Sequence, residues 1–421
     1  MKKLFWLAII GLIMAQGCKK DDNYGVFTPT SITSCSESTF QILISDMWNP
    51  TSITEDGNNN IIVLCDKNDE TIIIKVDTNG NVIWNKSYPN IPGRALEVIT
   101  LRDNSILFTS YMYNETEPIA NLPVFQNVYV QQAGLSNSCD PNFEFAVPID
   151  GYLVNSNSYL TKLDSNGNVM WTNHYAEGLV GGSSMFENSQ GNICFVTMKL
   201  YGRIPEPVYD NYGVFQDTVL YPTDKNTLSF YTIGVNGNTL LHKEITNVYN
   251  SEYDRISTKI NLQEINNYNI IQTEKNIMFL NSSGDIVKYE IIHEEYCTNI
   301  NKSMCADGNT ILVSGLYAAY DTTTMVYQNN QYIQQLSAQG NIDWEIANND
   351  LVLDYYSDRF IANGFDDNNL KMYDNNGNLL WELTSPGPMV GIINCNKGIT
   401  SALTNIDGDL IITRTNADGE F

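Results

Sequence analysis

The sequence predicts an all-β protein made of seven similar four-stranded units arranged in a ring, a seven-bladed β-propeller. Three observations predict this fold. A turn-and-strand pattern recurs seven times along the 421 residues. Without three long insertions, the units average roughly 43 residues, within the range of propeller blades. A spare strand precedes the first unit. Because 43% of the residues are hydrophobic, the chain can also bury a large core.

The repeated pattern has the chemistry of a β-hairpin. Residues 75–88, "KVDTNGNVIWNKSY", return almost unchanged at 162–175 as "KLDSNGNVMWTNHY". In each copy an apolar run meets an Asp and an Asn-Gly pair, and a second apolar run ends in Trp. Asn-Gly provides the positive φ angles of a tight turn, and the Asp side chain can accept hydrogen bonds from the N–H groups just ahead.

Seven copies of this hairpin can be counted, each centred on a glycine. A further turn and strand lie ahead of most copies, and several strands are apolar without strict alternation, as in strands that are covered on both faces. Four strands in a unit of this length are typical of a propeller blade, and an open β-solenoid is the alternative. The glycines are Gly80, Gly167, Gly237, Gly284, Gly340, Gly377 and Gly419.

The ends of the repeat predict how the ring closes. The seventh copy stops at Phe421, where its fourth strand should begin, whereas Thr39–Ser45 ("TFQILIS") is a strand without a unit. Pairing this strand beside the last one would close the ring and remove an exposed edge. We therefore expect a leader at 1–17, a linker at 18–37 and the propeller at 38–421.

Three blades carry insertions, and all three are expected between the second and third strands. They lie in blade 2 (about 113–159), blade 3 (about 202–226) and blade 5 (about 318–331). Connections of this kind open on one face of a propeller, so the insertions predict a raised rim there. "EPIANLPVFQN" in blade 2 parallels "EPVYDNYGVFQD" in blade 3, which predicts a repeated small hairpin.

Tyrosines gather on this predicted rim. A tyrosine ring offers apolar area and a hydroxyl at low entropic cost, which suits binding of a glycan or a protein. The alternative is that these side chains only hold the insertions on their blades, and we prefer that role for Phe125, Phe215 and Tyr327. The candidate ligand-binding residues are Tyr111, Tyr113, Tyr129, Tyr201, Tyr209, Tyr212, Tyr317 and Tyr320.

The pattern Asp-x-x-Gly-x-x-x-Trp, which ends at Trp84, Trp171 and Trp381, resembles the blade repeat of PQQ-like propellers of the quinoprotein dehydrogenase type. A fourth copy, ending at Trp344, has Ser in place of the Asp. The resemblance implies that these tryptophans pack between neighbouring blades. The quinone-dependent enzymes of that family use an adjacent Cys pair and usually eight blades. This chain has neither, so PQQ is not expected.

The leader, "MKKLFWLAIIGLIMAQGC", has two lysines, a short apolar run and small residues before Cys18. Its end resembles the lipobox of bacterial lipoproteins, although Ala15 stands where Leu is usual. The following "KKDDN" resembles the surface-export signal of Bacteroidota lipoproteins. The resemblances imply a lipid on Cys18, the outer membrane and exposure at the cell surface. The alternatives are a secretory leader with a coincidental Cys and a short acidic spacer.

Two threonines and several cysteines could be modified or paired in an exported protein. "DTV" and "DTT" resemble the O-glycosylation acceptor of Bacteroidota envelope proteins, which would modify Thr218 and Thr322. Cys65 and Cys194 lie in strand-like runs and are expected to be buried thiols. Cys297 and Cys305 are near enough in sequence to pair, but the sequence does not decide whether they do.

Charge and motifs restrict the function. The net charge of −25 repels phosphate backbones, so nucleic acid is not an expected partner. Common enzyme motifs are absent, only three histidines occur, and no metal or cofactor is predicted. Calcium has no support beyond the charge, since the Asp–Gly spacing does not fit an EF-hand loop.

Three functions remain. The first is a non-catalytic envelope lipoprotein that binds a glycan or a protein. The second is an envelope-assembly scaffold, similar to the propeller lipoprotein of the barrel-assembly machine. The third is a polysaccharide lyase or hydrolase that would use rim carboxylates, drawn from Glu115, Glu117, Glu206 and Asp210.

Overall fold

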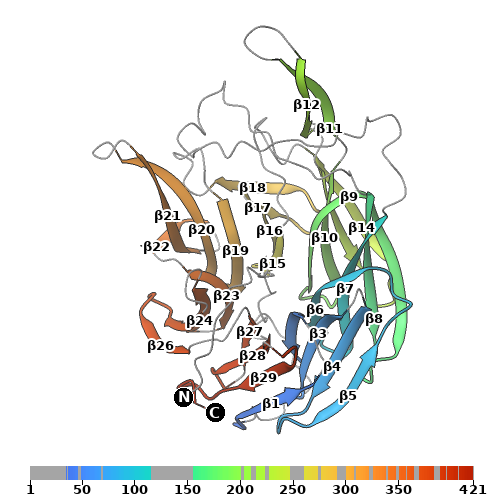
Figure 1. Ribbon diagram of the computed structural model, residues 1–421, viewed down its shortest axis with the longest axis vertical. Helices are drawn as coiled ribbons and strands as arrows, with labels where there is room; N and C mark the ends of the chain where they lie inside the picture. The colour runs from blue at the N-terminus through green and yellow to red at the C-terminus, as the bar shows by residue number, and fades with distance from the viewer. Residues whose placement is uncertain are drawn as a thin grey trace.

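The structure is a computed structural model in which every regular element of the described residues is a β-strand (Figure 1). Within that part of the chain there is no helix able to cross a membrane. The described residues are 35, 37–45, 49–67, 70–114, 155–200, 203–209, 215–222, 227–246, 260–273, 276–291, 300–307, 310–321, 326–337, 340–347, 350–356, 358–364, 369–383, 389–394, 396–405 and 407–420.

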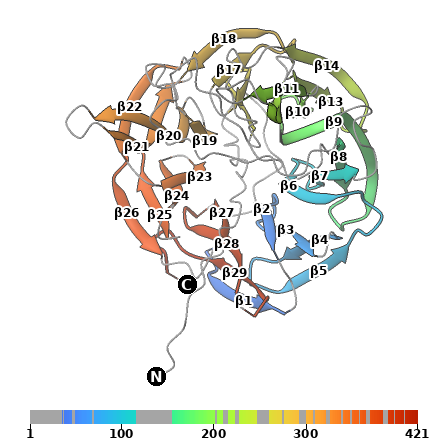
Figure 2. The same ribbon diagram turned by 45° about the horizontal axis from the view of Figure 1, so that its top comes forward.

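Seven four-stranded blades stand around one axis, which confirms the predicted propeller (Figure 2). In blades 1 to 6 the strands pair antiparallel in chain order, from the innermost to the outermost. Five of the blades form separate sheets, and blade 7 is one of these. The other four are blade 1, β2 (Pro50–Glu55), β3 (Ile61–Lys67), β4 (Glu70–Val76), β5 (Val82–Ser87); blade 4, β15 (Asn261–Ile265), β16 (Tyr268–Gln272), β17 (Asn276–Leu280), β18 (Ile286–Ile291); blade 5, β19 (Ile300–Asp307), β20 (Thr310–Asp321), β21 (Val326–Ser337), β22 (Ile342–Ala347); blade 6, β23 (Asp350–Tyr356), β24 (Arg359–Gly364), β25 (Leu370–Asp374), β26 (Leu379–Leu383).

Blades 2 and 3 share one long strand. Strand β9 pairs with β8 through Gly178 as the outer strand of blade 2, and from Leu179 it pairs with β10 as the inner strand of blade 3. The two blades therefore form one seven-stranded sheet. Its strands are β6 (Arg94–Thr100), β7 (Ile106–Asn114), β8 (Asn155–Leu163), β9 (Val169–Glu187), β10 (Ile193–Leu200), β13 (Thr227–Ile233) and β14 (Thr239–Thr246).

Blade 7 is completed by the amino-terminal strand, as predicted. Strand β1 (Phe40–Ile44) pairs antiparallel with β29 (Leu410–Arg414), with Ile42 opposite Ile412. The other strands of this blade are β27 (Met389–Ile393) and β28 (Ile399–Thr404). The predicted strand, Thr39–Ser45, is one residue longer at each end. The pairing closes the ring and leaves no open strand at the junction of blades 7 and 1.

The third-to-fourth-strand turns have the predicted chemistry. In blade 1, Asp77 Oδ1 accepts hydrogen bonds from the backbone N–H groups of Asn79 and Asn81, both at 2.8 Å. Gly80 has a φ of 86°, in the left-handed region that favours glycine. The same positive φ recurs at the other six predicted glycines. Asn281 and Asn416 make the equivalent bonds where the turn has no Asp.

Each turn glycine also packs on the outer strand of the preceding blade, where a side chain would not fit. A Cβ added at Gly237 would lie 3.0 Å from Trp171 and 2.9 Å from Asn173. The four tryptophans thus pack between blades, as the resemblance implied. Four junctions use such a contact: Trp84–Gly167, Trp171–Gly237, Trp344–Gly377 and Trp381–Gly419.

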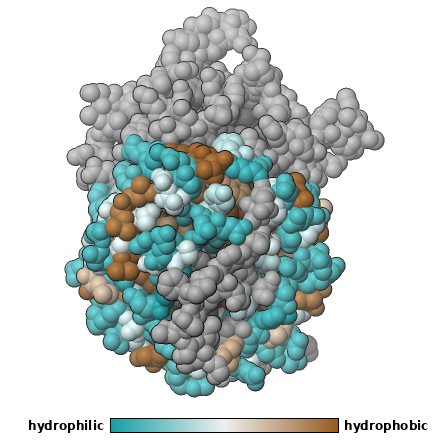
Figure 3. Space-filling view, turned by 180° about the vertical axis from the view of Figure 1, so that it is seen from behind, coloured by the Kyte–Doolittle hydropathy of each residue, from teal (hydrophilic) through white to brown (hydrophobic). Residues whose placement is uncertain are grey.

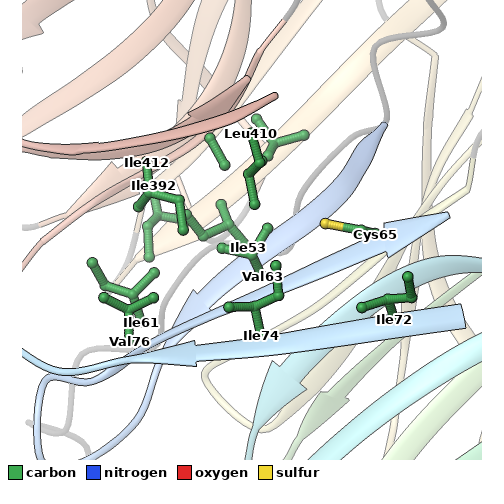
Figure 4. Packing of buried hydrophobic residues seen from close by; sticks show 12 residues of the cluster. Ile53, Ile61, Val63, Cys65, Ile72, Ile74, Val76, Ile392, Leu410 and Ile412 are labelled. Atoms are coloured by element: carbon green, nitrogen blue, oxygen red, sulfur yellow. The ribbon is translucent and has the colours of Figure 1, made fainter. Parts of the chain in front are cut away.

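The junction of blades 7 and 1 uses the same contact with a residue from the start of the chain. Phe40 and Ile42 on β1 lie against Gly80, where the other blades have Trp or a long side chain. Beneath them, aliphatic side chains of both blades interlock, with Ile53 and Val63 facing Leu410 and Ile412 (Figure 4).

A buried ion pair also crosses this junction. Arg414 on β29 lies 3.0 Å from Glu55 on β2, and both side chains have 0% exposure. Glu55 accepts a second bond from Thr400, and Arg414 donates to the carbonyl of Asn59. Because both charges are removed from water, hydrogen bonds from these partners are needed to offset the desolvation cost of the pair.

We expect Gly237→Ala to destabilise the protein more than Gly191→Ala does. The two glycines lie in turns of the same blade, with φ of 85° and 81°, but a Cβ at Gly191 would approach only Glu187, at 3.7 Å. Both changes carry the cost of a left-handed alanine, about 1 kcal/mol. Crowding of Trp171 should add about 1–3 kcal/mol at Gly237 alone. Equal losses in urea unfolding would contradict the packing role.

We expect Arg414→Met to lower the free energy of unfolding by about 3–5 kcal/mol, because it leaves the Glu55 carboxylate buried without its cation. The double variant Glu55→Gln/Arg414→Met should recover most of this loss. Denaturant unfolding of the single and double variants forms a complete cycle. If the double variant is no more stable than Arg414→Met, the loss does not come from the unpaired charge.

Candidate functional site

The ring has two different faces. The turn face carries the first-to-second and third-to-fourth-strand turns, including those of Gly191 and Gly237. The insertion face carries the second-to-third-strand connections. In blades 2, 3 and 5 the strands that flank these connections are long: β7 and β8 have nine residues each, and β20 and β21 have twelve. The three predicted insertions therefore lie on the same face.

The insertion of blade 3 is a hairpin of its own, as the repeated motif predicted. Strands β11 (Arg203–Tyr209) and β12 (Phe215–Pro222) pair only with each other and stand above the ring (Figure 1). Tyr209 pairs with Phe215 at the end near the turn. Thr218, a predicted glycosylation site, lies on β12 opposite Pro207. Thr322 lies outside the described residues.

The insertion of blade 5 is an outward continuation of the blade's own strands. Residues 318–331 lie between the second and third strands of blade 5, as expected, and β20 and β21 stay paired there from Thr310–Ser337 to Asp321–Val326. Tyr320 lies opposite Tyr327 near this outer end. The blade thus extends above the ring as a two-stranded ribbon with a complete backbone hydrogen-bond ladder.

The candidate tyrosines are distributed over all three insertions. Tyr111 and Tyr113 lie on β7, and Tyr111 is half-buried. Tyr209 lies on β11, and Tyr317 and Tyr320 lie on β20. Tyr129, Tyr201 and Tyr212 lie outside the described residues, as does Cys18. The structure places the described tyrosines on strands of the insertion face and does not test contact with a ligand.

A buried polar cluster lies between blades 2 and 3, at the end of their interface that faces the insertions. Glu97 on β6 is 5% exposed and pairs in register with Thr109 on β7. Ser158 on β8 and Thr197 on β10 share a hydrogen bond of 3.2 Å across the junction. Nearer the turn face the same interface is apolar, with Leu107, Leu160 and Phe195.

Burial raises the pKa of the Glu97 carboxyl to about 8. The Met185 N–H and the Ser184 hydroxyl on β9 lie near enough to lower that pKa, but they do not compensate for the loss of water. The hydroxyls of Thr109 and Ser183 have no hydrogen-bond partner among the described residues. Around pH 7, Glu97 is therefore mostly a neutral acid that can donate a hydrogen bond.

The sequence analysis missed Glu97. Its only signal is a single acidic residue in the apolar inner strand "RALEVIT". The carboxylates proposed for catalysis are not assembled in the described part: Glu115, Glu117 and Asp210 lie outside it, and Glu206 is placed only by its position on β11 opposite Val219.

No group of three His, Cys, Asp or Glu side chains fit to hold a metal occurs among the described residues. His174 and His242 lie on the outer strands β9 and β14. The His174 ring contacts Asn157 at 3.1 Å, and the His242 ring stacks on Tyr231 at 4.4 Å between centroids. Both rings thus pack on their own blades, and His293 lies outside the described part.

The cysteines fall into two groups. Cys65 and Cys194 are buried thiols, as predicted, and burial together with Asp66 raises the pKa of Cys65 to about 12. Cys35 and Cys305 are disulfide-bonded.

No family model and no curated protein matches the sequence. Solved structures match over most of the chain. Virginiamycin B lyase from Staphylococcus aureus, a catalytically inactive variant with quinupristin, has 10% identity and a TM-score of 0.51 and covers 90% of this chain and 99% of its own. BamB from Moraxella catarrhalis has 8% identity and a TM-score of 0.41, with 86% and 82% covered. A Bacteroides caccae protein of unknown function has 12% identity and a TM-score of 0.40, with 83% and 94% covered.

At these identities the similarity shows the propeller fold alone. The resemblance of the repeat to PQQ-like propellers stays a prediction, because no family model matches the sequence. The candidate site therefore has to be argued from this chain's own insertion face and from the polar cluster beneath it.

Glu97 should make the protein less stable as the pH rises from about 5 to 8. The carboxyl keeps its proton in the folded state up to about pH 8, whereas the unfolded chain releases it near 4.5. The folded state thus binds more protons in this window, and the stabilisation, on the order of a few kcal/mol, is lost as the pH rises.

Glu97→Gln should flatten this part of the stability curve, measured by urea unfolding at several pH values. Asp164→Asn is the control. Hydrogen bonds from Asn168 and Asn166 lower the pKa of Asp164, so it titrates below this window, and Asn already serves at this turn position in blades 4 and 7. An unchanged slope in Glu97→Gln would refute the assignment.

Proposed function

We propose that this protein is a cell-envelope lipoprotein, anchored in the outer membrane and exposed at the cell surface, whose insertion face binds a glycan or protein partner without catalysis. One observation carries the proposal: the enlarged second-to-third-strand connections of blades 2, 3 and 5 all lie on the same face of a closed ring. Loops that a rigid scaffold holds on one side are the usual place for recognition.

The architecture of the rim supports binding. Strands β20 and β21 remain paired out to Asp321–Val326, and β11–β12 is a paired hairpin. Such elements hold their side chains with little loss of conformational entropy when a partner binds. Tyr209 and Tyr320 lie at the outer ends of these two ribbons, where a partner would meet them first.

Export is supported by two independent features. The sequence up to Cys18 resembles a lipobox, and "KKDDN" resembles a surface-export signal. Cys35 and Cys305 are disulfide-bonded, and disulfides form and persist mainly in oxidising compartments. The PQQ-like resemblance adds the propeller repeat but no chemistry, since the chain has no adjacent Cys pair.

No observation of the described residues favours the other two functions. A glycosidase needs two carboxyl groups at a set separation, whereas Glu97 is a single buried acid below the rim. An envelope-assembly scaffold would also bind through a propeller face, but its partners would lie on the periplasmic side of the membrane.

We expect the protein to lose binding to its partner when the blade 5 ribbon is shortened. Residues 318–329 would be replaced by Asn-Asp, the pair that joins β3 to β4 in blade 1. Binding to a glycan array and to crosslinked cell-surface proteins should fall at least tenfold, while the unfolding midpoint stays near that of the wild type. Asp418→Ala, an exposed change on the turn face, is the control.

Protease treatment of intact cells separates the surface binder from a periplasmic scaffold, because only the former is cut. If products are released from a bound polysaccharide, the protein is a polysaccharide-degrading enzyme and the proposal of binding without catalysis is wrong. If the shortened variant binds every probe as the wild type does, the insertion face is not the binding surface.

A further inference from the structure

The direction of β1 fixes where the amino-terminal segment reaches the propeller. Phe40, the first residue of β1, packs on Gly80 in a turn of the turn face, and β1 runs from there toward the insertion face. Residues before Phe40 therefore join the ring at the turn face. Cys35, five residues earlier, is disulfide-bonded, which limits how far this segment can move.

The chain between the lipid-bearing Cys18 and Cys35 is short. Sixteen residues separate these two cysteines, and a random coil of this length has an average end-to-end distance of roughly 25 Å. The two faces of the ring lie at opposite ends of the blade strands, about 20 Å apart for a strand of six or seven residues. A lipid on Cys18 would thus hold the turn face near the bilayer, whereas the insertion face would lie farther from it by at least that strand length.

The outer strands expose apolar side chains next to the turn face. In blades 1 to 6 a β-bulge lies at the start of the outer strand, so that two residues oppose one; in blade 1, for example, Val82 and Ile83 precede Trp84. The exposed side chains at these positions, here called the apolar margin, are Val82, Ile83, Val169, Met170, Leu240, Ile286, Val287, Ile342, Leu379 and Leu380.

The bulges alone do not account for the apolar margin. A bulge at an outer strand blocks pairing with other sheets, but proteins usually combine it with Lys or other charged residues. Here Met170 is 57% exposed and Ile342 is 58% exposed. Figure 3 shows hydrophobic patches among hydrophilic ones on the side of the ring. These side chains gain no burial within the ring and can gain it only from a partner.

We propose that the turn face is the membrane-proximal face, with the apolar margin against the interface of a zwitterionic bilayer and the insertion face turned away from it. The proposal rests on the lipid anchor of the proposed function. It commits to a lipid surface because the anchored segment arrives at this same face. Zwitterionic lipid fits, since a net charge of −25 repels anionic headgroups.

Two matched labels test the orientation. Asn79 on the turn face and Asp407 on the insertion face are both exposed, and each donates its backbone N–H to the first residue of an equivalent turn. Two variants of the lipidated full-length protein, Asn79→Cys and Asp407→Cys, are each labelled with a fluorophore and bound to phosphatidylcholine vesicles. Nitroxide groups attached to the lipid headgroups of these vesicles should quench the label at 79 at least threefold more than the label at 407. Equal or reversed quenching overturns the proposal.

The apolar margin has its own variant. Val169→Asn/Met170→Asn should weaken quenching of the label at 79 at least twofold. Leu43→Asn, which changes an equally exposed side chain toward the insertion-face end of β1, should leave it unchanged. If quenching of the label at 79 is unchanged in both variants, the apolar margin does not contact lipid and this part of the proposal is wrong.

The anchor and the orientation can fail separately. Protein that carries no acyl chain by mass spectrometry refutes the lipoprotein assignment. The orientation is then measured with a hexahistidine tag in place of Cys18 on nickel-chelating lipid mixed with phosphatidylcholine. Quenching confined to the label at 79 supports the membrane-proximal turn face in either case.

Discussion

The architecture depends on one contact: the glycine of each third-to-fourth-strand turn lies on the outer strand of the preceding blade. Two constraints meet in that residue. The turn needs a positive φ, and the close approach leaves no space for a Cβ, as at Gly237 beneath Trp171. Other residues of the repeat are replaceable, because Asn281 makes the bonds of Asp77. This explains why the glycine is present in all seven units whereas the Asp and the Trp are not.

The ring closes through the same contact, supplied by the opposite end of the chain. Phe40 packs on Gly80, and β1 pairs with β29 across more than 350 residues of sequence. The buried Glu55–Arg414 pair adds a specific polar partner at this junction, where aliphatic packing alone would tolerate a shifted register. Since these contacts are the least local in the chain, we expect the junction of blades 7 and 1 to form late in folding.

Local chemistry made the blades, the turns and the closing strand predictable, because hairpins are encoded within about ten residues. The rest depended on contacts that are distant in sequence. "AEGLVGGSSMF" after Tyr175 has no Asn, Asp or Pro turn signal, and β9 does run through it without a turn, but only the pairing with β8 and β10 shows that one strand serves two blades. The sequence placed the blade 5 insertion between the second and third strands, but only the register of β20 with β21 shows that the two strands stay paired out to Asp321–Val326. Glu97 gave little signal, since burial raises its pKa and that burial arises when the blades pack together, which the local sequence does not show.

The two faces separate stability from recognition. Each ring-closing contact described above lies at or near the turn face or within the blades, whereas β11 and β12 pair only with each other and the outer parts of β20 and β21 pair with each other. Lengthening a second-to-third-strand connection therefore costs little more than loop entropy, about 0.6 kcal/mol for each doubling. Insertions can change size and sequence without disturbing the glycine contacts.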